Sequence, residues 1–389
     1  MSAAPLQTVQ ITGLFPELAA IGGVQEAGRM TAFALQEIAG SRGWSLDVLA
    51  LNDSSGPQTL RLDERTVAFE GYARAKLSFV RSAMKRARAA MRCDTHVIFA
   101  GHPNLAPIAV WMQKTSPKAR AIVVAHGIEV WKVLPVLRRA TIKSAFRVVA
   151  PSADTIQKLI QVQQVPPDRT RKLPWPLSPA FLRLADHPGT LSLPADFPLD
   201  SDVLLTVGRA AASERYKGAD SLLHAFARLH DAFPHLRLVS VGGGDDLPRL
   251  QALAKELGIS NRVHFLQGLS REEIAACYAD SQVFALPSAG EGFGLVFLEA
   301  MAFGKPVIAA AAGGALDLVR DQVNGLLVPP QDVASITASL SRLLQDRELR
   351  ESLGRRGAAM VRDAYRFESF QGELERILDE CAVDSRMYK

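Results

Sequence analysis

The stretch from Ala285 to Ala310, ALPSAGEGFGLVFLEAMAFGKPVIAA, constrains the fold of this chain more than any other. It begins at the end of an apolar run that predicts a buried strand, which Pro287 and Ser288 end. The glycine-rich loop AGEGFG follows, then an apolar helical pattern that Gly304 should end, then a second short apolar strand. This order of strand, loop, helix and strand predicts part of an α/β sheet with the loop at the amino end of the helix.

Two carboxylates lie near the start of that helix. Glu291 is in the loop and Glu299 is about two turns into the helix, while Gly292 and Gly294 leave main-chain N–H groups uncovered beside them. Such a loop can bind an anion at the helix N-terminus, and the carboxylates can accept hydrogen bonds from hydroxyl groups. A ligand that carries a phosphate next to a polyol is a nucleotide sugar, and this stretch indicates that ligand class.

The alternation of strand and helix continues through the whole chain. In the first half, a strand at 7–13 precedes a helical pattern that Gly40 should end, and a strand at 45–51 follows. The second half begins again with a strand at 202–209. Because 389 residues suit two domains of roughly 150 to 200 residues, we predict two doubly wound, parallel α/β sheets.

Proline-dense sequence between residues 174 and 200 separates the two halves. We predict an N-terminal Rossmann-like domain at 1–185, a linker at 186–200 and a nucleotide-sugar-binding domain at 201–365. The final segment, 366–389, is expected to form a helix that packs back on the N-terminal domain. Two such domains would face each other across a cleft.

Composition argues against other classes of protein. The chain is 48% apolar and 22% charged, and no window approaches the roughly 18 uninterrupted apolar residues of a membrane span. The first residues lack a basic segment followed by an apolar one, so we expect no signal peptide. Cys93, Cys277 and Cys381 are scattered and far from metal-ligand spacing. We therefore expect reduced thiols and a cytoplasmic protein.

The net charge of +5 hides an asymmetry between the halves. Residues 1–185 carry 24 Lys and Arg against 12 Asp and Glu, whereas the remainder carries 21 against 28. Within the basic half, segment 71–93 contains seven basic residues and no acid, with apolar residues at helical spacing. It is interpreted either as a surface helix with a solvated basic face or as a helix that rests on anionic lipid headgroups. Nucleic-acid binding is disfavoured because no DNA- or RNA-binding motif appears.

Several chemistry-bearing residues follow predicted strands. His102 and His126 lie at the carboxyl ends of two strands, the edge at which open α/β sheets bind ligands. The pair Gly22–Gly23 lies at a strand-to-helix turn, and is either a plain tight turn or a close approach to a phosphate. Arg209 and Lys217 bracket the loop after the strand at 202–209, where two cations suit a diphosphate.

Taken together, these motifs resemble the retaining glycosyltransferases of family four, which have two Rossmann-like domains in the GT-B arrangement. In the second half the resemblance covers about 200–335, and its pieces occur in the family's order: GR at 208–209, RYKG at 215–218, VGGGDD at 241–246, VHFLQG at 263–268, Glu291 to Glu299, GKPVIA at 304–309, GG at 313–314 and NGLLVPP at 324–330. The first half matches more thinly. Its pieces are similar to bacterial exopolysaccharide and lipid-linked-saccharide members, mannosyltransferase-like ones included: GGVQ at 22–25, GHPNLAP at 101–107 and HGIEVW at 126–131.

The resemblance implies a role for each matching residue. Arg209 and Lys217 would neutralise the donor diphosphate, Glu299 would bind the ribose, and Glu291 would face the transferred sugar. The implied catalytic residues are His126, Glu291, Arg209 and Lys217. Donor binding further involves Gly22, Gly23, Gly243, His264, Phe265, Leu266, Gly292, Phe293, Gly294, Leu295 and Glu299. The N-terminal domain would be the acceptor side, with His102 and Glu129 as its candidates. The loop between Arg209 and Lys217 is longer than in the simplest members, which leaves its path open.

The expected reaction is a retaining transfer of a hexose from a nucleotide diphosphate sugar, without metal or cofactor. Fixed cations would stabilise the leaving phosphate, which would help to deprotonate the acceptor on the same face. One D-x-D sequence, Asp200–Ser201–Asp202, is interpreted as a charged turn. The alternatives are a nucleotide-sugar epimerase of the same fold, a non-catalytic sugar-binding protein and a dinucleotide-binding oxidoreductase. The oxidoreductase motif lacks its third glycine, since Gly242–Gly243–Gly244 is followed by Asp245.

The substrates are less constrained than the reaction. GDP-mannose and UDP-sugars remain open as donors, and a saccharide or a lipid-linked saccharide remains open as acceptor, in polysaccharide or glycolipid biosynthesis. A lipid-linked acceptor would place the enzyme peripherally on the inner face of the plasma membrane, with segment 71–93 in contact with it.

Overall fold

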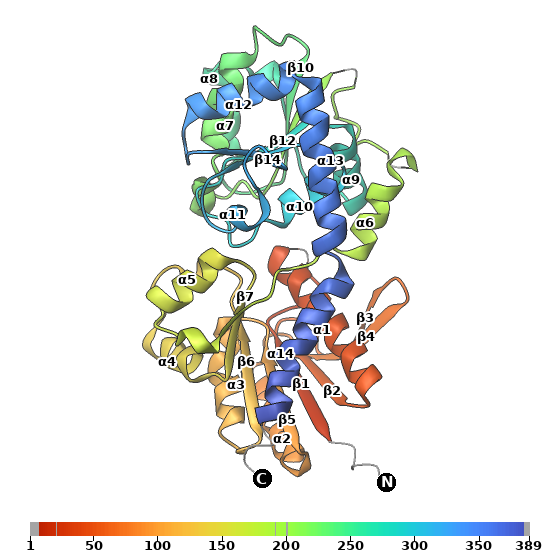
Figure 1. Ribbon diagram of the computed structural model, residues 1–389, viewed down its shortest axis with the longest axis vertical. Coiled ribbons are helices and arrows are strands. Elements are labelled where there is room, and N and C mark those ends of the chain that lie inside the picture. Colours follow the sequence, from red (N-terminus) through yellow and green to blue (C-terminus); the bar gives the residue numbers. More distant parts are fainter. Residues whose placement is uncertain (1–7, 21, 191, 200, 385–389) are drawn as a thin grey trace. The chain divides into compact units, whose positions relative to one another are not determined.

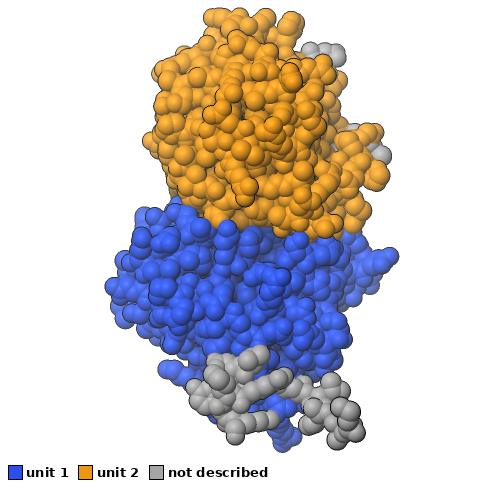
Figure 2. Space-filling view, in the orientation of Figure 1, with its two compact units in different colours: residues 1–176, 367–389 blue, residues 177–366 orange. Residues whose placement is uncertain are grey.

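The computed structural model describes residues 8–20, 22–190, 192–199 and 201–384, in two units (Figures 1 and 2). Unit 1 comprises residues 1–176 and 367–389, and unit 2 comprises residues 177–366. The expected linker, 186–200, falls in unit 2. Gln7 of the first expected strand and Asp200 of the D-x-D sequence lie outside the described residues.

The described residues of unit 1 contain an eight-stranded sheet in the order β3-β4-β2-β1-β5-β6-β7-β8. All neighbouring strands are parallel except β3 and β4. The strands are β1 (Val9–Phe15), β2 (Ser45–Ala50), β3 (Gly56–Leu62), β4 (Arg65–Gly71), β5 (Thr95–Ala100), β6 (Ala119–Val124), β7 (Arg147–Ala150) and β8 (Thr170–Lys172). The helices are α1 (Gly23–Arg42), α2 (Lys76–Ala89), α3 (Ala106–Gln113), α4 (Val136–Ser144), α5 (Ala153–Gln161) and α14 (Phe367–Asp384).

Two features of unit 1 differ from the sequence-based expectation. Helix α1 continues through Gly40 to Arg42, and Gly43 ends it with a left-handed φ of 67° and an N–H bonded to the carbonyls of Ala39 and Gly40. The prediction that Gly40 ends this helix was therefore wrong. The β3–β4 hairpin is antiparallel, which was not predicted, because its residues alternate in exposure and lack the continuous apolar run typical of a buried parallel strand.

The described residues of unit 2 contain a six-stranded parallel sheet in the order β11-β10-β9-β12-β13-β14. Its strands are β9 (Asp202–Val207), β10 (Leu236–Val241), β11 (Val263–Leu266), β12 (Val283–Leu286), β13 (Val307–Ala310) and β14 (Gly325–Val328). Its helices are α6 (Pro179–Asp186), α7 (Ala219–Leu229), α8 (Leu247–Glu256), α9 (Arg271–Asp280), α10 (Leu295–Ala302), α11 (Ala315–Leu318), α12 (Val333–Gln345) and α13 (Arg347–Ala364). The prediction of two α/β domains dominated by parallel strands is confirmed.

The last helix, α14, belongs to unit 1 and packs along α1 (Figure 1). Arg42 of α1 contacts Glu375, with Nη2 and Oε1 2.6 Å apart, and Glu380 accepts hydrogen bonds from Arg147 and Arg171. Among the described residues, none of the helices is both long enough and apolar enough to cross a membrane.

Candidate functional site

The loop after β12, residues 287–294, is held by a close main-chain contact with Gly313 and Gly314. The N–H of Gly314 donates to the carbonyl of Glu291 over 2.7 Å. A Cβ added at Gly314 would lie 2.6 Å from the carbonyl oxygen of Gly292, so a larger residue would displace the loop. At its other end, Gly294 has a φ of 99°, and no described side chain caps helix α10 after it. The loop therefore brings its backbone and the first turn of α10 together without a covering side chain.

Glu291 is the acidic residue in this loop. Its Oε1 atom is buried and, among the described residues, has no hydrogen-bond partner. Burial raises the pKa of Glu291, while Lys217 and a hydrogen bond from Ser288 oppose that rise. A buried acceptor without a partner is costly in a folded protein, so this oxygen is suited to accept a hydrogen bond from a ligand hydroxyl.

The two predicted cations, Arg209 and Lys217, are held by the same carboxylate. Glu214 is 8% exposed, its Oε1 accepts a hydrogen bond from Arg209, and its Oε2 lies 2.7 Å from Lys217 Nζ. Sequence reasoning missed Glu214, although an acid three residues before a lysine is a usable signal for an ion pair. The Arg209 side chain is 71% exposed, so it can contact a ligand while Glu214 holds it.

Tight glycine packing brings this cation loop to the edge of the sheet. Gly242 has a φ of 129°, and a Cβ there would lie 2.2 Å from the carbonyl oxygen of Gly208. Gly218 has a φ of 80°, and its added Cβ would lie 2.5 Å from the carbonyl oxygen of Pro287. The loops after β9, β10 and β12 are thus in contact, and the carboxyl edge of the sheet collects the cations and the Glu291 loop in one place.

Tyr216 connects the two loops. Its carbonyl accepts a hydrogen bond from the N–H of Ala289 over 2.7 Å. Burial, together with the nearby carboxylates of Glu214 and Glu291, raises the pKa of Tyr216 to about 12, so its hydroxyl stays protonated.

Glu299 of α10 is positioned by a tyrosine that sequence reasoning did not find. Tyr278 of α9 is fully buried, and its hydroxyl donates to Oε2 of Glu299 over 2.9 Å. Burial and the adjacent carboxylate raise the pKa of Tyr278 well above its ordinary value, which keeps it a donor. No local pattern around Tyr278 marks it, since its partner is 21 residues away.

The predicted base-binding segment lies on the edge strand β11. Leu266 accepts a hydrogen bond from the N–H of Gly242 over 2.8 Å, which ties the end of β11 to the glycine loop. The His264 ring is hydrogen-bonded to the main chain of Asp196, while burial and then the charge of Arg237 lower its pKa. Gln267, which sequence reasoning missed, lies beside Gly243, where an added Cβ would be 2.7 Å from its Oε1.

In unit 1 the predicted histidines meet at the carboxyl edge of its own sheet. The rings of His102 and His126 are stacked with centroids 5.8 Å apart, and His126 also stacks on Trp175 at 5.4 Å. Nε2 of His126 lies 2.8 Å from the carbonyl of Gly101, so it carries the proton in the neutral ring. Glu129 accepts a hydrogen bond from the N–H of His126 over 2.5 Å.

Both histidines are neutral at pH 7. Burial, reinforced by the neighbouring His126, lowers the pKa of His102 to about 4. Burial also lowers the pKa of His126, although Glu129 opposes the shift. Nδ1 of His102 accepts a hydrogen bond from the N–H of Asn104 over 3.1 Å. A neutral imidazole acts here as a hydrogen-bonding surface and not as a cation.

Gly22 and Gly23 begin helix α1, and among the described residues no side chain caps this end. Gly22 has a φ of 155°, and a Cβ added at Gly23 would meet no described atom within 4 Å. The predicted approach of a phosphate is therefore sterically open at Gly23, whereas a Cβ added at Gly22 would lie 2.4 Å from Oε1 of Gln25.

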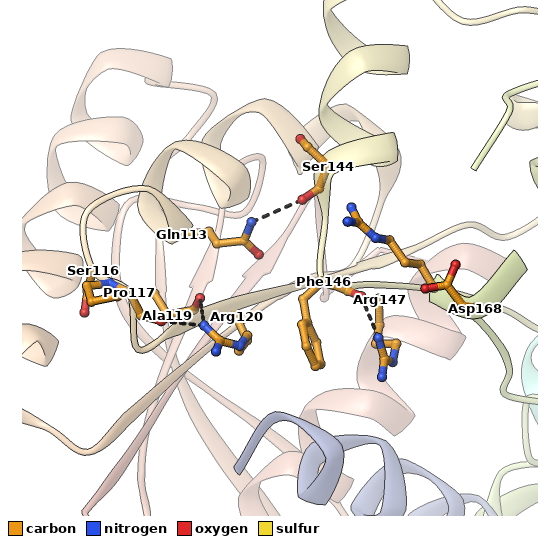
Figure 3. A pocket seen from close by; sticks show the side chains of 10 residues that line it. Gln113, Ser116, Pro117, Ala119, Arg120, Ser144, Phe146, Arg147 and Asp168 are labelled. Carbon is orange, nitrogen blue, oxygen red and sulfur yellow. Dashed lines mark hydrogen bonds between the residues drawn. The ribbon is translucent and has the colours of Figure 1, made fainter. Parts of the chain in front are cut away.

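A cavity of about 550 Å³ lies at the opposite, amino-terminal edge of the unit 1 sheet (Figure 3). Its arginines are already engaged: Arg147 with Glu380, Arg169 with the carbonyl of Lys143, and Arg120 with the carbonyl of Pro117. It contains none of the predicted site residues. Within the described part of the chain, no group of three or more His, Cys, Asp or Glu is arranged to hold a metal ion.

Comparison with known proteins is consistent with this arrangement. The family described as Glycosyl transferases group 1 matches residues 194–360. A GDP-mannose-dependent alpha-(1-6)-phosphatidylinositol monomannoside mannosyltransferase from Mycolicibacterium smegmatis is 30% identical over 351 residues, which cover 83% of this chain and 82% of that protein.

Solved structures share the fold over nearly the whole chain. Sucrose-phosphate synthase from Thermosynechococcus elongatus superposes with a TM-score of 0.75 at 24% identity, covering 97% of this chain and 100% of that one. Anabaena HepE in complex with UDP gives a TM-score of 0.68 at 18% identity, covering 96% and 100%. These structures define the fold class as GT-B, with two Rossmann-like units. The chain belongs to the group 1 glycosyltransferases, and it is a glycosyl-transferring enzyme.

Proposed function

We propose that this enzyme transfers a hexose, with retention of configuration, from a nucleoside diphosphate sugar to a saccharide or lipid-linked saccharide. The observation that carries the proposal is the arrangement in unit 2: Arg209 and Lys217 are held by Glu214, beside the Glu291 oxygen that has no hydrogen-bond partner in the described part of the chain. The pair of cations suits a diphosphate, and this acceptor suits a sugar hydroxyl. GDP-mannose and UDP-sugars are the donor candidates, because the Mycolicibacterium relative is named for GDP-mannose and the HepE structure contains UDP.

The donor would be bound along the carboxyl edge of the unit 2 sheet. Glu299, oriented by Tyr278, would accept hydrogen bonds from the ribose, and the main chain of 264–266 would hold the base. Phe293, Gly294 and Leu295 would offer main-chain N–H groups to the sugar and phosphate at the start of α10. Gly243 and Gly292 would let the donor approach the backbone closely.

In the proposed reaction, the bond from the anomeric carbon to the diphosphate oxygen breaks and a bond to the acceptor oxygen forms on the same face. The acceptor proton passes to the leaving phosphate. Arg209 and Lys217 stabilise the negative charge that develops on that phosphate, and we expect this to be the strongest stabilisation of the transition state. Glu291 orients the sugar and stabilises its positive charge without forming a covalent bond.

Residues of unit 1 would complete the reaction. His126, neutral and with its Nδ1 lone pair available, would accept a hydrogen bond from a donor-sugar hydroxyl. Gly22 and Gly23 would admit the diphosphate to the amino end of α1, and His102 and Glu129 would lie on the acceptor side. Replacing His126 with Ala should lower kcat more than it weakens donor binding, and equal losses in both would contradict a role in the transition state.

The acceptor is proposed to be lipid-linked, with the enzyme on the inner face of the plasma membrane. Helix α2 supports this, because Arg81, Lys85 and Arg88 are exposed and Leu77 is 74% exposed on the same helix. Arg86 is not part of this surface, since it contacts Glu70 and Asp47 at 2.8 and 3.2 Å. Reversing Lys85 and Arg88 to Glu should weaken binding to anionic vesicles, most strongly at low salt; unchanged binding would exclude α2 as the contact.

A donor screen tests the proposed reaction class. Thermal shift and calorimetry with GDP-mannose, UDP-glucose and UDP-galactose should identify one nucleotide that stabilises the native chain. Incubation with that donor alone then separates transfer from epimerisation, because an epimerase interconverts the sugar without an acceptor. Interconversion of the donor sugar would favour the epimerase, and stabilisation by NADH but by no nucleotide sugar would contradict the proposal.

A further inference from the structure

Residues 132–137, KVLPVL, form an exposed apolar tip in unit 1 that comprises the end of the connection from β6 and the first two residues of α4. Val133, Val136 and Leu137 are 63%, 86% and 66% exposed. Single exposed apolar residues are common on protein surfaces, whereas three within five residues form a patch that calls for a partner. Ile128, also exposed, lies just before the tip in the short helical turn Ile128–Val130.

The buried side chain of Gln163 anchors the tip. The amide of the fully buried Gln163 donates to the carbonyls of Val130 and Lys132, each over 2.7 Å, and its Oε1 accepts from the N–H of Leu134. Leu134 is itself buried in the core of unit 1. These contacts anchor the loop at residues 130, 132 and 134, so the fold itself holds Val133, Val136 and Leu137 in exposed positions.

Two cations adjoin the apolar side chains of the tip. Lys132 is exposed within it, and the half-buried Arg138 follows it directly in helix α4. Glu129, three residues before the tip, accepts a hydrogen bond from the N–H of His126. Exposed apolar side chains next to cations match the boundary between anionic headgroups and acyl chains.

The tip also lies close to the predicted acceptor side in sequence and structure. It begins six residues after His126, on the same loop that leaves the carboxyl edge of β6, and Glu129 lies between them. A membrane contacted at this point would place lipid headgroups at the edge of the sheet where the two histidines stack.

We propose that residues 132–137 insert into the surface of an anionic phospholipid bilayer, and that this insertion presents a lipid-embedded acceptor to the carboxyl edge of unit 1. This inference rests on the proposed transfer to a lipid-linked acceptor and adds a second membrane contact, formed by apolar insertion, to the proposed basic contact of helix α2. A bilayer is favoured over a second protein, because a stable protein interface uses about 20–30 residues a side and this tip offers six.

Vesicle co-sedimentation of the full chain tests the proposal. The probe is phosphatidylcholine vesicles with and without phosphatidylglycerol. The double variant Val136→Ser with Leu137→Ser should lose about tenfold in partitioning to the anionic vesicles, and the loss should persist at high salt because it removes apolar contact. The matched control is Leu199→Ser in unit 2, whose side chain is similarly exposed at 67% and which should bind vesicles as the native chain does.

A second variant, Lys132→Glu, should weaken binding only to the anionic vesicles and only at low salt. Native-like partitioning of the double serine variant would overturn the proposal. So would a native dimer that the same substitutions dissociate in light scattering, since a second copy would then cover the tip. Calorimetric binding of the nucleotide-sugar donor, measured on the same variants, reports on the proposed function separately, because the tip variants should bind donor normally.

Discussion

The carboxyl edges of the two sheets carry side chains of different charge and chemistry. In unit 2 the edge holds charge: Arg209 and Lys217 bracket a buried Glu214, next to the Glu291 loop. In unit 1 the histidines at the edge are neutral: His102, His126 and Trp175 stack in a row, and Glu129 accepts a hydrogen bond from the main chain beside them. The same topological position thus carries paired cations in one unit and stacked, neutral imidazole rings in the other.

This difference has a structural cause. At the unit 2 edge the cations Arg209 and Lys217 are paired with Glu214, and glycines let three loops pack main chain to main chain beside them. The histidines of unit 1 are buried between aromatic rings and main chain, where the charged form is disfavoured. A leaving diphosphate suits the first environment, and a sugar with neutral hydroxyl groups suits the second.

The largest effect on turnover is expected when a positive charge is removed from the unit 2 edge. Lys217→Ala should lower the turnover of the donor about 10²–10³-fold, the cost typical of losing one group that stabilises a developing anion. Steady-state release of nucleotide from the donor measures it. Arg215→Ala is the matched control, since Arg215 lies in the same loop but contacts Asp246 at 3.0 Å. Near-native turnover of Lys217→Ala would contradict the proposal that the unit 2 cations stabilise the leaving diphosphate.

The second prediction concerns the neutral histidines of unit 1 and pH. The pKa of His96, buried beside Thr12, is lowered to about 4, as is that of His102. Between the unfolded value near 6.5 and pH 4 the unfolded chain binds more protons, so stability falls as pH drops through this window. At about 1.4 kcal/mol per pKa unit, His96 alone accounts for roughly 3 kcal/mol at most.

Urea unfolding between pH 7 and pH 4 checks this. His96→Gln keeps a hydrogen-bonding group toward Thr12 and should flatten the pH dependence, whereas His224→Gln at an exposed site should not. If the native chain keeps constant stability down to pH 4, His96 and His102 take up protons as readily in the folded as in the unfolded state, and the description of the buried unit 1 histidines as neutral is wrong.

Much of the unit 2 site was predictable from sequence because its determinants are local. The glycines, Glu291, Glu299 and the Arg209–Lys217 bracket occur within short motifs whose strand and helix context is also local. Tyr278 and Gln267 were missed because each meets its partner only after the sheet is assembled. The antiparallel β3–β4 hairpin was missed because half-exposed strands lack the apolar run that marked the others.

A third prediction tests whether main-chain packing positions the charges. Gly314→Ala should place a Cβ 2.6 Å from the carbonyl oxygen of Gly292, and the loop must move to accommodate it. A cost of about 1–3 kcal/mol in unfolding free energy is expected, with weaker donor binding. Gly372→Ala, where an added Cβ meets no described atom within 4 Å, is the control. If Gly314→Ala keeps the unfolding free energy and the donor affinity of the native chain, the loop tolerates displacement.

The smallest expected effect separates orientation from charge within unit 2. Tyr278→Phe deletes the hydroxyl that donates to Glu299 over 2.9 Å but keeps the ring that stacks on Phe303. Because this hydrogen bond only orients Glu299, its loss should weaken donor binding by about 0.5–1.5 kcal/mol, and by less where water replaces the hydroxyl. Calorimetry with the nucleoside diphosphate alone should show the loss, because Glu299 is proposed to contact the ribose. Deoxyribonucleoside diphosphates, which lack one ribose hydroxyl, should bind native and Tyr278→Phe enzymes with more similar affinities. If Tyr278→Phe weakens the binding of ribo- and deoxyribonucleotides equally, Tyr278 acts only in packing. The charges of Arg209 and Lys217 would then be the main determinants of donor binding.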